Sequence, residues 1–193
     1  VGVYKGYTSE KLAEFLAGQG ELHLFDFEDR VLEVKARLNA AGFNNIIAHG
    51  NSRKLADSYN WSLMRVMQAH PEPLFDYVFL DGAHTWEIDG LTFFLVDRLL
   101  KNGGYLDLDD WAWSLETSPS LNPSVFPATD AMYTEEQIRE QHVRLIIDLL
   151  VRRDGRYAEV VHNKIFRKDS SGPELHAKAE ALTLIGDVRG RDV

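Results

Sequence analysis

The chain has 193 residues, of which 45% are hydrophobic and 26% charged, and its formal net charge is −9. This length and apolar content suffice for one domain with a substantial core. The acidic balance argues against a nucleic-acid surface, which needs clustered Lys and Arg. The lack of cysteine excludes disulfides, thiolate catalysis and cysteine zinc sites. No apolar run is long enough to span a membrane, so we expect a cytoplasmic protein without a membrane partner.

A glycine turn opens the chain. The residues Val1-Gly2-Val3-Tyr4-Lys5-Gly6 predict the end of a strand followed by a tight turn, and the strand itself is expected to be truncated. Thr8 or Ser9 is predicted to cap a helix that carries Leu12, Phe15 and Leu16 on one face.

Strands and helices then alternate along the chain. Apolar runs predict strands over 22–27 and 45–48, and helical stripes follow them at Val31, Val34 and Leu38 and then at Leu55, Tyr59, Leu63 and Met67. Two further strands end at Asp81 and Asp109, and the stripe Ile88, Leu91, Leu95 and Leu99 predicts a helix between them. The alternation predicts an α/β fold with a doubly wound, mostly parallel Rossmann-like sheet.

The pattern changes after Trp111. Residues 111–130 contain three prolines and no period, which predicts a lid over a site. Thr134 and Gln137 form a capping box for one helix with Ile138, His142, Leu145, Ile146 and Leu149 on one side. Residues 157–167 predict a C-terminal antiparallel strand or hairpin near Asn163. We therefore expect one domain over 1–168 and a polar tail over 169–193.

Acidic residues follow the two central strands where ligands bind in such sheets. Asp81, His84, Asp109 and Asp110 should converge on one crevice beyond the carboxyl ends of these strands. Three carboxylates would repel one another, so the crevice favours a divalent metal or a cationic ligand. A single Asp after a strand is commonly only a helix cap, whereas the doubled acid is harder to explain that way.

Other residues point to a nucleoside. Asp26 follows Gly6 by 20 residues at the end of the next strand, where an acid accepts hydrogen bonds from ribose hydroxyls; a solvated loop acid is the alternative. Asn51 and Ser52 could bond an adenine edge or form a simple turn. His84 could accept a proton from a bound hydroxyl, although a lone histidine is more often structural. Trp111 and Trp113 either wall an apolar substrate or pack the lid.

These residues resemble, over residues 1–168 and in motif order, the class I S-adenosylmethionine (SAM)-dependent methyltransferases, and among them the metal-dependent O-methyltransferases. The resemblance implies that Gly2, Tyr4, Gly6, Asp26, Asn51, Ser52 and Asp81 contact SAM. It further implies that Asp81, Asp109 and Asp110 bind Mg²⁺ or another divalent cation and that His84 is the catalytic base. Histidine at this place is similar to the macrolide-sugar enzymes, whereas the catechol type has lysine.

The expected reaction is methyl transfer from SAM to a hydroxyl of a small molecule. Three alternatives stay open: an NAD-dependent oxidoreductase, a metal-dependent hydrolase acting on water, and a non-catalytic domain of the same fold. The small-molecule acceptor is the expected partner, nucleic acid is not, and a homo-oligomer is left open.

Overall fold

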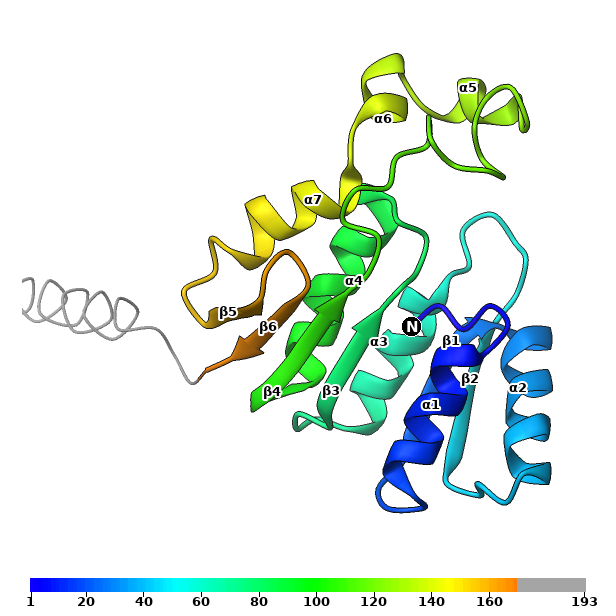
Figure 1. Cartoon of the computed structure of the whole chain (residues 1–193), viewed down its shortest axis with the longest axis vertical. Coiled ribbons are helices and arrows are strands. Elements are labelled where there is room, and N and C mark those ends of the chain that lie inside the picture. Colours follow the sequence, from blue (N-terminus) through cyan, green and yellow to red (C-terminus); the bar gives the residue numbers. More distant parts are fainter. Residues whose placement is uncertain (170–193) are drawn as a thin grey trace, which may run out of the picture.

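The computed structural model describes residues 1–169, so nearly all of the predicted polar tail over 169–193 lies outside the described residues. Figure 1 shows the elements in chain order. The first half contains α1 (Tyr7–Leu16), β1 (Leu22–Phe27), α2 (Glu28–Ala40), β2 (Ile46–Asn51), α3 (Tyr59–Ala69), β3 (Phe75–Leu80), α4 (Trp86–Leu99) and β4 (Leu100–Leu108). The second half contains α5 (Ala128–Met132), α6 (Glu135–Arg139), α7 (His142–Ile146), the π-helical turn η1 (Ile147–Val151), β5 (Tyr157–Val161) and β6 (Ile165–Lys168).

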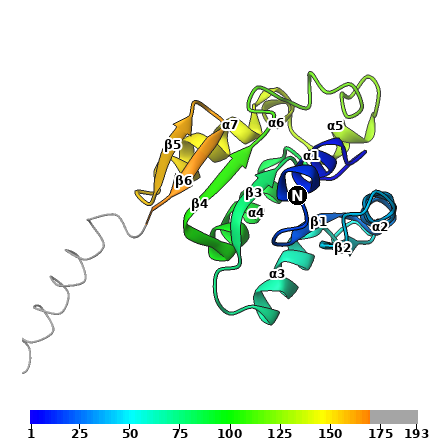
Figure 2. The same ribbon diagram turned by 60° about the horizontal axis from the view of Figure 1, so that its bottom comes forward.

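The strands confirm the predicted α/β class. β1 pairs in parallel with β2, and β3 pairs in parallel with β4, with Leu80 opposite Leu108. β6 then runs antiparallel to β4, and β5 runs antiparallel to β6, so the predicted C-terminal hairpin is present. Because the parallel strands share one direction, the ends of β3 and β4 lie at the same edge of the sheet (Figure 2).

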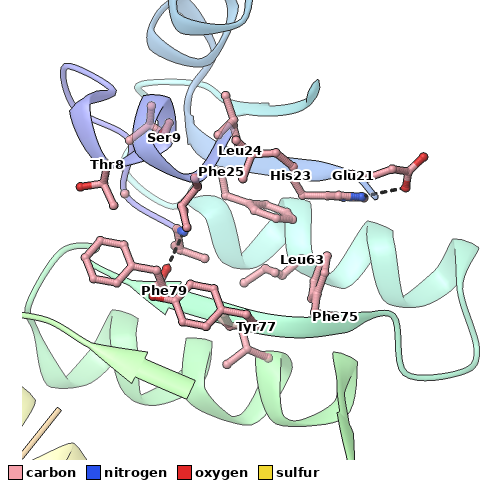
Figure 3. A pocket seen from close by; sticks show the side chains of 17 residues that line it. Thr8, Ser9, Glu21, His23, Leu24, Phe25, Leu63, Phe75, Tyr77 and Phe79 are labelled. Carbon is pink, nitrogen blue, oxygen red and sulfur yellow. Dashed lines mark hydrogen bonds and ion pairs between the residues drawn. The ribbon is translucent and has the colours of Figure 1, made fainter. Parts of the chain in front are cut away.

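The start of the chain lies between the two parallel pairs. Val1 donates its amino hydrogen to the Phe79 carbonyl at 2.8 Å, and its own carbonyl accepts from the Asp81 N–H at 3.0 Å. The Gly2 N–H donates to the Phe25 carbonyl at 2.9 Å. Beside these bonds, a cavity of about 100 Å³ lies between β1 and β3 and is lined by residues of both strands and of α1 (Figure 3). The opening turn is thereby fixed to both β1 and β3.

Helices cover both faces of β1. Leu24 packs in a core cluster with Val31 and Val34 of α2, while Phe25 packs in a second cluster with Leu63 of α3. Successive side chains of a strand point to opposite faces, so α2 and α3 lie on opposite sides of the sheet. This is the doubly wound arrangement that the alternation predicted.

Two helix starts differ from the prediction. α1 begins at Tyr7 after Gly6, which has φ 77°, so Thr8 and Ser9 lie inside the helix and do not cap it. Phe15 is 85% exposed and is not part of the buried face. α3 begins at Tyr59, with Ser58 accepting the Asn60 N–H, and Leu55 lies fully exposed before it.

The apolar faces of two helices also differ from the prediction. The buried face of α4 is turned toward Phe93, Val96 and Leu99, and Leu91 is half exposed. The Thr134–Gln137 capping box is confirmed, but the helix that follows is interrupted after Arg139 and resumes at His142. Of the helices within 1–169, none combines the length and the apolar character needed to cross a membrane.

Candidate active site at the ends of β3 and β4

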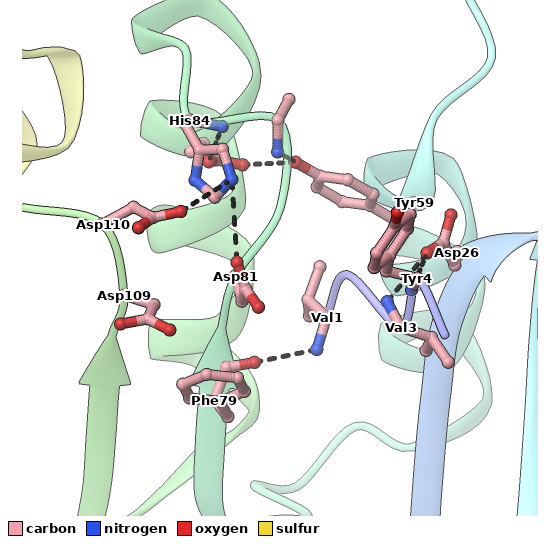
Figure 4. Close-up of polar contacts among 12 residues, drawn as sticks. Val1, Val3, Tyr4, Asp26, Tyr59, Phe79, Asp81, His84, Asp109 and Asp110 are labelled. Carbon is pink, nitrogen blue, oxygen red and sulfur yellow. Dashed lines mark hydrogen bonds and ion pairs between the residues drawn. The ribbon is translucent and has the colours of Figure 1, made fainter. Parts of the chain in front are cut away.

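Three of the predicted residues form a compact cluster. The His84 Nε2 lies 3.6 Å from an Asp81 carboxylate oxygen and 3.3 Å from an Asp110 oxygen. One ligand atom from each of the three side chains lies within 4.8 Å of those of the other two. Figure 4 shows the imidazole of His84 between the two acids. The structure thus brings together residues from the ends of two neighbouring strands, as the sequence predicted.

Sheet pairing places this cluster. Asp81 follows β3 directly, and the Asp109 N–H donates to the Leu80 carbonyl at 3.0 Å, which extends the parallel pairing to the site. His84 and Asp110 both adopt left-handed backbone conformations, with φ 58° and φ 60°. Such conformations are uncommon for residues other than glycine and need support from the surroundings.

Asp109 has a different partner. Its carboxylate lies 3.1 Å from the ammonium group of Lys164, which also lies 3.1 Å from Asp107. Asp109 therefore stands beside the cluster but is not one of the three residues that converge most closely. Burial alone would lower the pKa of Lys164, but its hydrogen bonds to Asp109 and Asp107 raise it. Lys164 comes from the hairpin between β5 and β6, so only the folded sheet reveals this contact.

The cluster carries unfavourable negative charge at Asp81. Burial raises the pKa of this carboxyl, and the neighbouring Asp109 and Asp110 raise it further, while His84 acts in the opposite direction. A carboxylate in such surroundings is stabilised by a cation. Two carboxylates and an imidazole are also an accepted ligand set for divalent metals.

A cleft of about 820 Å³ runs along the ends of β1, β2 and β3, from the two-stranded sheet of β1 and β2 to the four-stranded sheet that contains β3 and β4. Its lining includes these predicted residues: Gly2, Tyr4, Asp26, Asn51, Asp81, His84 and Asp110. It also includes Tyr59, Gly82 and Ile88, together with basic residues at the β1 and β2 ends, Arg30, Arg53 and Lys54. A cleft of this size fits a cofactor-sized ligand.

Asp26 holds the glycine turn. One of its carboxylate oxygens accepts the Val3 N–H at 2.7 Å and the Tyr4 N–H at 2.9 Å. The other accepts the N–H of Phe27 at 2.7 Å, and Arg30 lies 3.5 Å away. Asp26 is only 7% exposed, yet it lines the cleft. It therefore fixes the turn against β1 and borders the cleft.

Asn51, Ser52 and Gly6 occupy different surroundings. Asn51 lines the cleft but is only 7% exposed, and its buried side-chain oxygen has no hydrogen-bond partner within the described residues. Ser52 lies outside the cleft lining and donates its N–H to Asp57 at 2.6 Å. Gly6 is also outside the lining; a Cβ there would collide with Val34, so this glycine allows α1 to approach α2.

The two tryptophans have different neighbours. The Trp113 ring is 5.2 Å from the His84 ring, measured between centroids. The Trp111 ring lies under the Arg144 guanidinium at 5.3 Å, and its indole nitrogen is buried without a partner within residues 1–169. Trp113 thus borders the site, whereas Trp111 packs against α7. In the predicted lid, 111–127 forms turns and α5 begins at Ala128.

Sequence reasoning overlooked two buried polar residues next to His84. The sequence pattern places Tyr59 in an apolar stripe and does not distinguish Asp89, but the Tyr59 hydroxyl donates to the Asp89 carboxylate. The signal in the sequence is Asp89 itself, an acid within a predominantly apolar helix. When such a helix buries an acid, the carboxylate is almost always paired with another polar group.

Comparison with known proteins supports the fold. No protein-family model matches the chain, and no curated protein matches it by sequence. Among solved structures, it is similar to the O-methyltransferase TomG from Streptomyces achromogenes in complex with SAM, with 19% identity, a TM-score of 0.56, and coverage of 88% of this chain and 71% of that one. It is also similar to the O-methyltransferase from Bacillus cereus bound to SAH, with 16% identity and a TM-score of 0.57, covering 86% and 71%.

The chain has the fold of the class I SAM-dependent O-methyltransferases. A third match with this fold is a candidate caffeoyl-CoA O-methyltransferase from Staphylococcus aureus, with 14% identity, a TM-score of 0.52, and coverage of 86% of this chain and 71% of that one. At such identities the likeness concerns the fold, so chemistry has to be argued from the site itself.

Proposed function

We propose that the protein is a SAM-dependent O-methyltransferase that uses a divalent cation, in the first place Mg²⁺, to methylate a hydroxyl of a small molecule. The observation that carries this proposal is the cluster of Asp81, His84 and Asp110 at one end of a cleft that also contains the glycine turn and Asp26. The proteins of similar fold that hold SAM or SAH are themselves O-methyltransferases by name, which supports the same reaction class.

The cleft fits the chemistry of SAM. A Cβ at Gly2 would collide with the Asp81 carbonyl, so glycine lets the turn lie directly against the end of β3. Asn51 lines the same cleft, and with its side chain turned toward the cleft its oxygen would accept a hydrogen bond from a ribose hydroxyl or an adenine amino group. Asp26 lies in the same lining, and its carboxylate oxygen that accepts only the Phe27 N–H would accept a further hydrogen bond from a ribose hydroxyl. These residues would bind the nucleoside portion and direct the sulfonium toward Asp81.

The cluster fits a hard divalent cation. Asp81 and Asp110 would hold it through carboxylate oxygens, with Asp109 as a further ligand if it leaves Lys164. Bound there, Mg²⁺ supplies Lewis acidity, which lowers the pKa of the acceptor hydroxyl. A cation would also stabilise the carboxylate of Asp81, whose pKa is raised by burial and by the neighbouring Asp109 and Asp110.

His84 would act as the general base. Its Nε2 accepts the hydroxyl proton, and Asp110, at 3.3 Å, stabilises the imidazolium that results. SAM, held by the glycine turn and Asp26, would supply the methyl group: the acceptor oxygen would bond to the methyl carbon as the carbon–sulfur bond breaks, with SAH, a neutral thioether, as the leaving group. Alignment of oxygen, methyl and sulfur contributes about 7–11 kcal/mol. Trp113 borders this position and helps to exclude water.

Thermal unfolding with added nucleotides tests the cofactor assignment. At SAH concentrations of 100 times the dissociation constant, the expected gain in the free energy of unfolding is about 2.7 kcal/mol. The gain should be lost in Asp26→Ala, while Asp76→Ala, which removes an exposed acid from β3, is the matched control. Stabilisation by NAD and none by SAH would contradict the proposal and favour an oxidoreductase.

A further inference from the structure

The loop that carries His84 rests on two buried side chains. The Tyr59 hydroxyl accepts the Ala83 N–H at 2.8 Å and donates to one oxygen of Asp89. The other Asp89 oxygen accepts the His84 N–H at 2.8 Å. Tyr59 is 8% exposed and Asp89 is 2% exposed, so solvent cannot replace these partners. Consecutive backbone N–H groups of the loop are thus bound to one Tyr–Asp pair.

The backbone of this loop requires such support. His84 has φ 58°, in the left-handed region that is unfavourable for a residue with a Cβ. Gly82 lies so close to the pair that a Cβ there would come within 2.7 Å of the Asp89 carboxylate. The loop therefore packs directly on Tyr59 and Asp89, and its conformation depends on them.

Both members of the pair are fixed at the beginnings of helices. Tyr59 is the first residue of α3, and Asp89 lies in the first turn of α4. The Asn60 side chain donates to the Ile88 carbonyl at 3.0 Å and accepts from the Thr92 hydroxyl at 2.6 Å, so the two helix starts are joined by further buried hydrogen bonds. A carboxylate near a helix N-terminus is also favoured by the helix dipole.

We propose that Tyr59 and Asp89 are positioning residues that hold the imidazole of His84 between Asp81 and Asp110. This inference rests on the proposed function only in taking that cluster to be the catalytic site. Tyr59 and Asp89 act through the Ala83 and His84 backbone, because their hydrogen bonds to the loop are with its N–H groups. Loss of the pair should widen the cluster without removing any of its side chains.

The chain offers a matched control for a merely structural role. Tyr157 donates its hydroxyl to the buried carboxylate of Asp97 at 2.9 Å, at the opposite end of α4. Tyr59→Phe and Tyr157→Phe therefore remove the same hydroxyl from the same kind of pair. Both variants should unfold at a lower temperature than the wild type, but only the first should disturb His84.

Two measurements separate a displaced His84 from a damaged cation site. Calorimetric titration with Mn²⁺ should show similar affinity in Tyr59→Phe and Tyr157→Phe, because in the proposed function Asp81 and Asp110 hold the cation and both variants keep these side chains. The nuclear Overhauser effects between the His84 and Trp113 rings, whose centroids are 5.2 Å apart, should weaken only in Tyr59→Phe. Asp89→Asn, which keeps the shape of the side chain, should behave like Tyr59→Phe in the ring contacts.

The ring contacts decide the proposal even where other parts of the account fail. Unchanged His84–Trp113 contacts in Tyr59→Phe, or equal losses in Tyr59→Phe and Tyr157→Phe, would overturn it. If Tyr59→Phe does not fold, Asp89→Asn takes its place in the same comparison. Absence of methyl transfer or of Mn²⁺ binding in the wild type would count against the proposed function, while selective loss of the ring contacts would still support the positioning role.

Discussion

The two ends of α4 use the same kind of buried pair in different ways. At the last turn, Asp97 accepts from Tyr157 and is also paired with Arg156 at 2.9 Å and Lys168 at 3.2 Å. At the first turn, Asp89 accepts from Tyr59 and from the His84 N–H. Within residues 1–169, no Lys or Arg forms an ion pair with Asp89, in contrast to the two cations at Asp97.

Helix electrostatics explains the difference. The C-terminal end of a helix disfavours a negative charge and the N-terminal end favours one. Asp97 therefore needs cations, and the hairpin strands β5 and β6 provide them. Asp89 needs fewer partners, which leaves it free to bind the loop that carries His84. The far end of α4 is a structural anchor, and the near end supports the site.

The largest expected effect is on turnover, and it comes from His84, whose loop is held by Asp89 at the first turn of α4. His84→Gln should lower methyl-transfer turnover by about 10²–10⁴-fold with SAH affinity retained, since general base catalysis typically contributes that much. A loss below about threefold at every pH would return His84 to the structural histidines and leave the cation as the activator.

At the last turn of α4, a substitution should lower the stability of the protein and leave the active site unchanged. Asp97→Asn leaves the buried ammonium of Lys168 without its counter-charge and should lower the free energy of unfolding by about 3–5 kcal/mol. Urea unfolding measures the loss, and Mn²⁺ affinity of the folded variant should equal that of the wild type. A variant of normal stability but weakened Mn²⁺ binding would reverse the roles assigned to the two ends of α4.

Asp89 should make the free energy of unfolding depend on pH. Burial raises its pKa in the folded state, so its contribution to stability is present below the unfolded pKa and is lost as pH rises through the folded pKa. From about pH 4 upward, the wild type should therefore lose stability relative to Asp89→Asn. Parallel stability curves for the two proteins would show that the buried carboxyl is not perturbed in this way.

The smallest effect concerns the predicted lid, residues 111–130. If these residues close over bound ligands, SAH with Mg²⁺ should slow proteolysis within them, because a bound ligand lowers the population of open states. A second cleavage site, in an exposed turn remote from the cleft such as 18–20, serves as the internal control. Equal cutting rates with and without ligands would make this segment a spacer.

Much of the site was predictable from local pattern. Apolar runs locate β3 and β4, and the residues that come after two parallel strands lie at the same edge of the sheet, which brings Asp81 and Asp110 together. The position of Asp26 beside the glycine turn was predictable by the same rule. These inferences need only the order of strands and helices.

The remainder depends on contacts between distant segments. Lys164 reaches Asp109 only because β6 pairs with β4, and no local pattern encodes that partner. The rotation of α4 follows from two buried acids, Asp89 and Asp97, which an apolar stripe cannot anticipate. The start of α1 was misplaced because Gly6, at φ 77°, ends the turn where a hydroxyl cap was expected.

Calorimetric titration of the SAH-saturated protein with Mn²⁺ tests the central claim most directly, because it measures the cation site without requiring the acceptor. We predict one cation bound per chain in the wild type and none in Asp81→Asn. The substitution should leave SAH bound and should not lower stability, since it removes a carboxylate whose pKa is raised by burial and by neighbouring acids. Equal Mn²⁺ affinity in the two proteins would contradict the account.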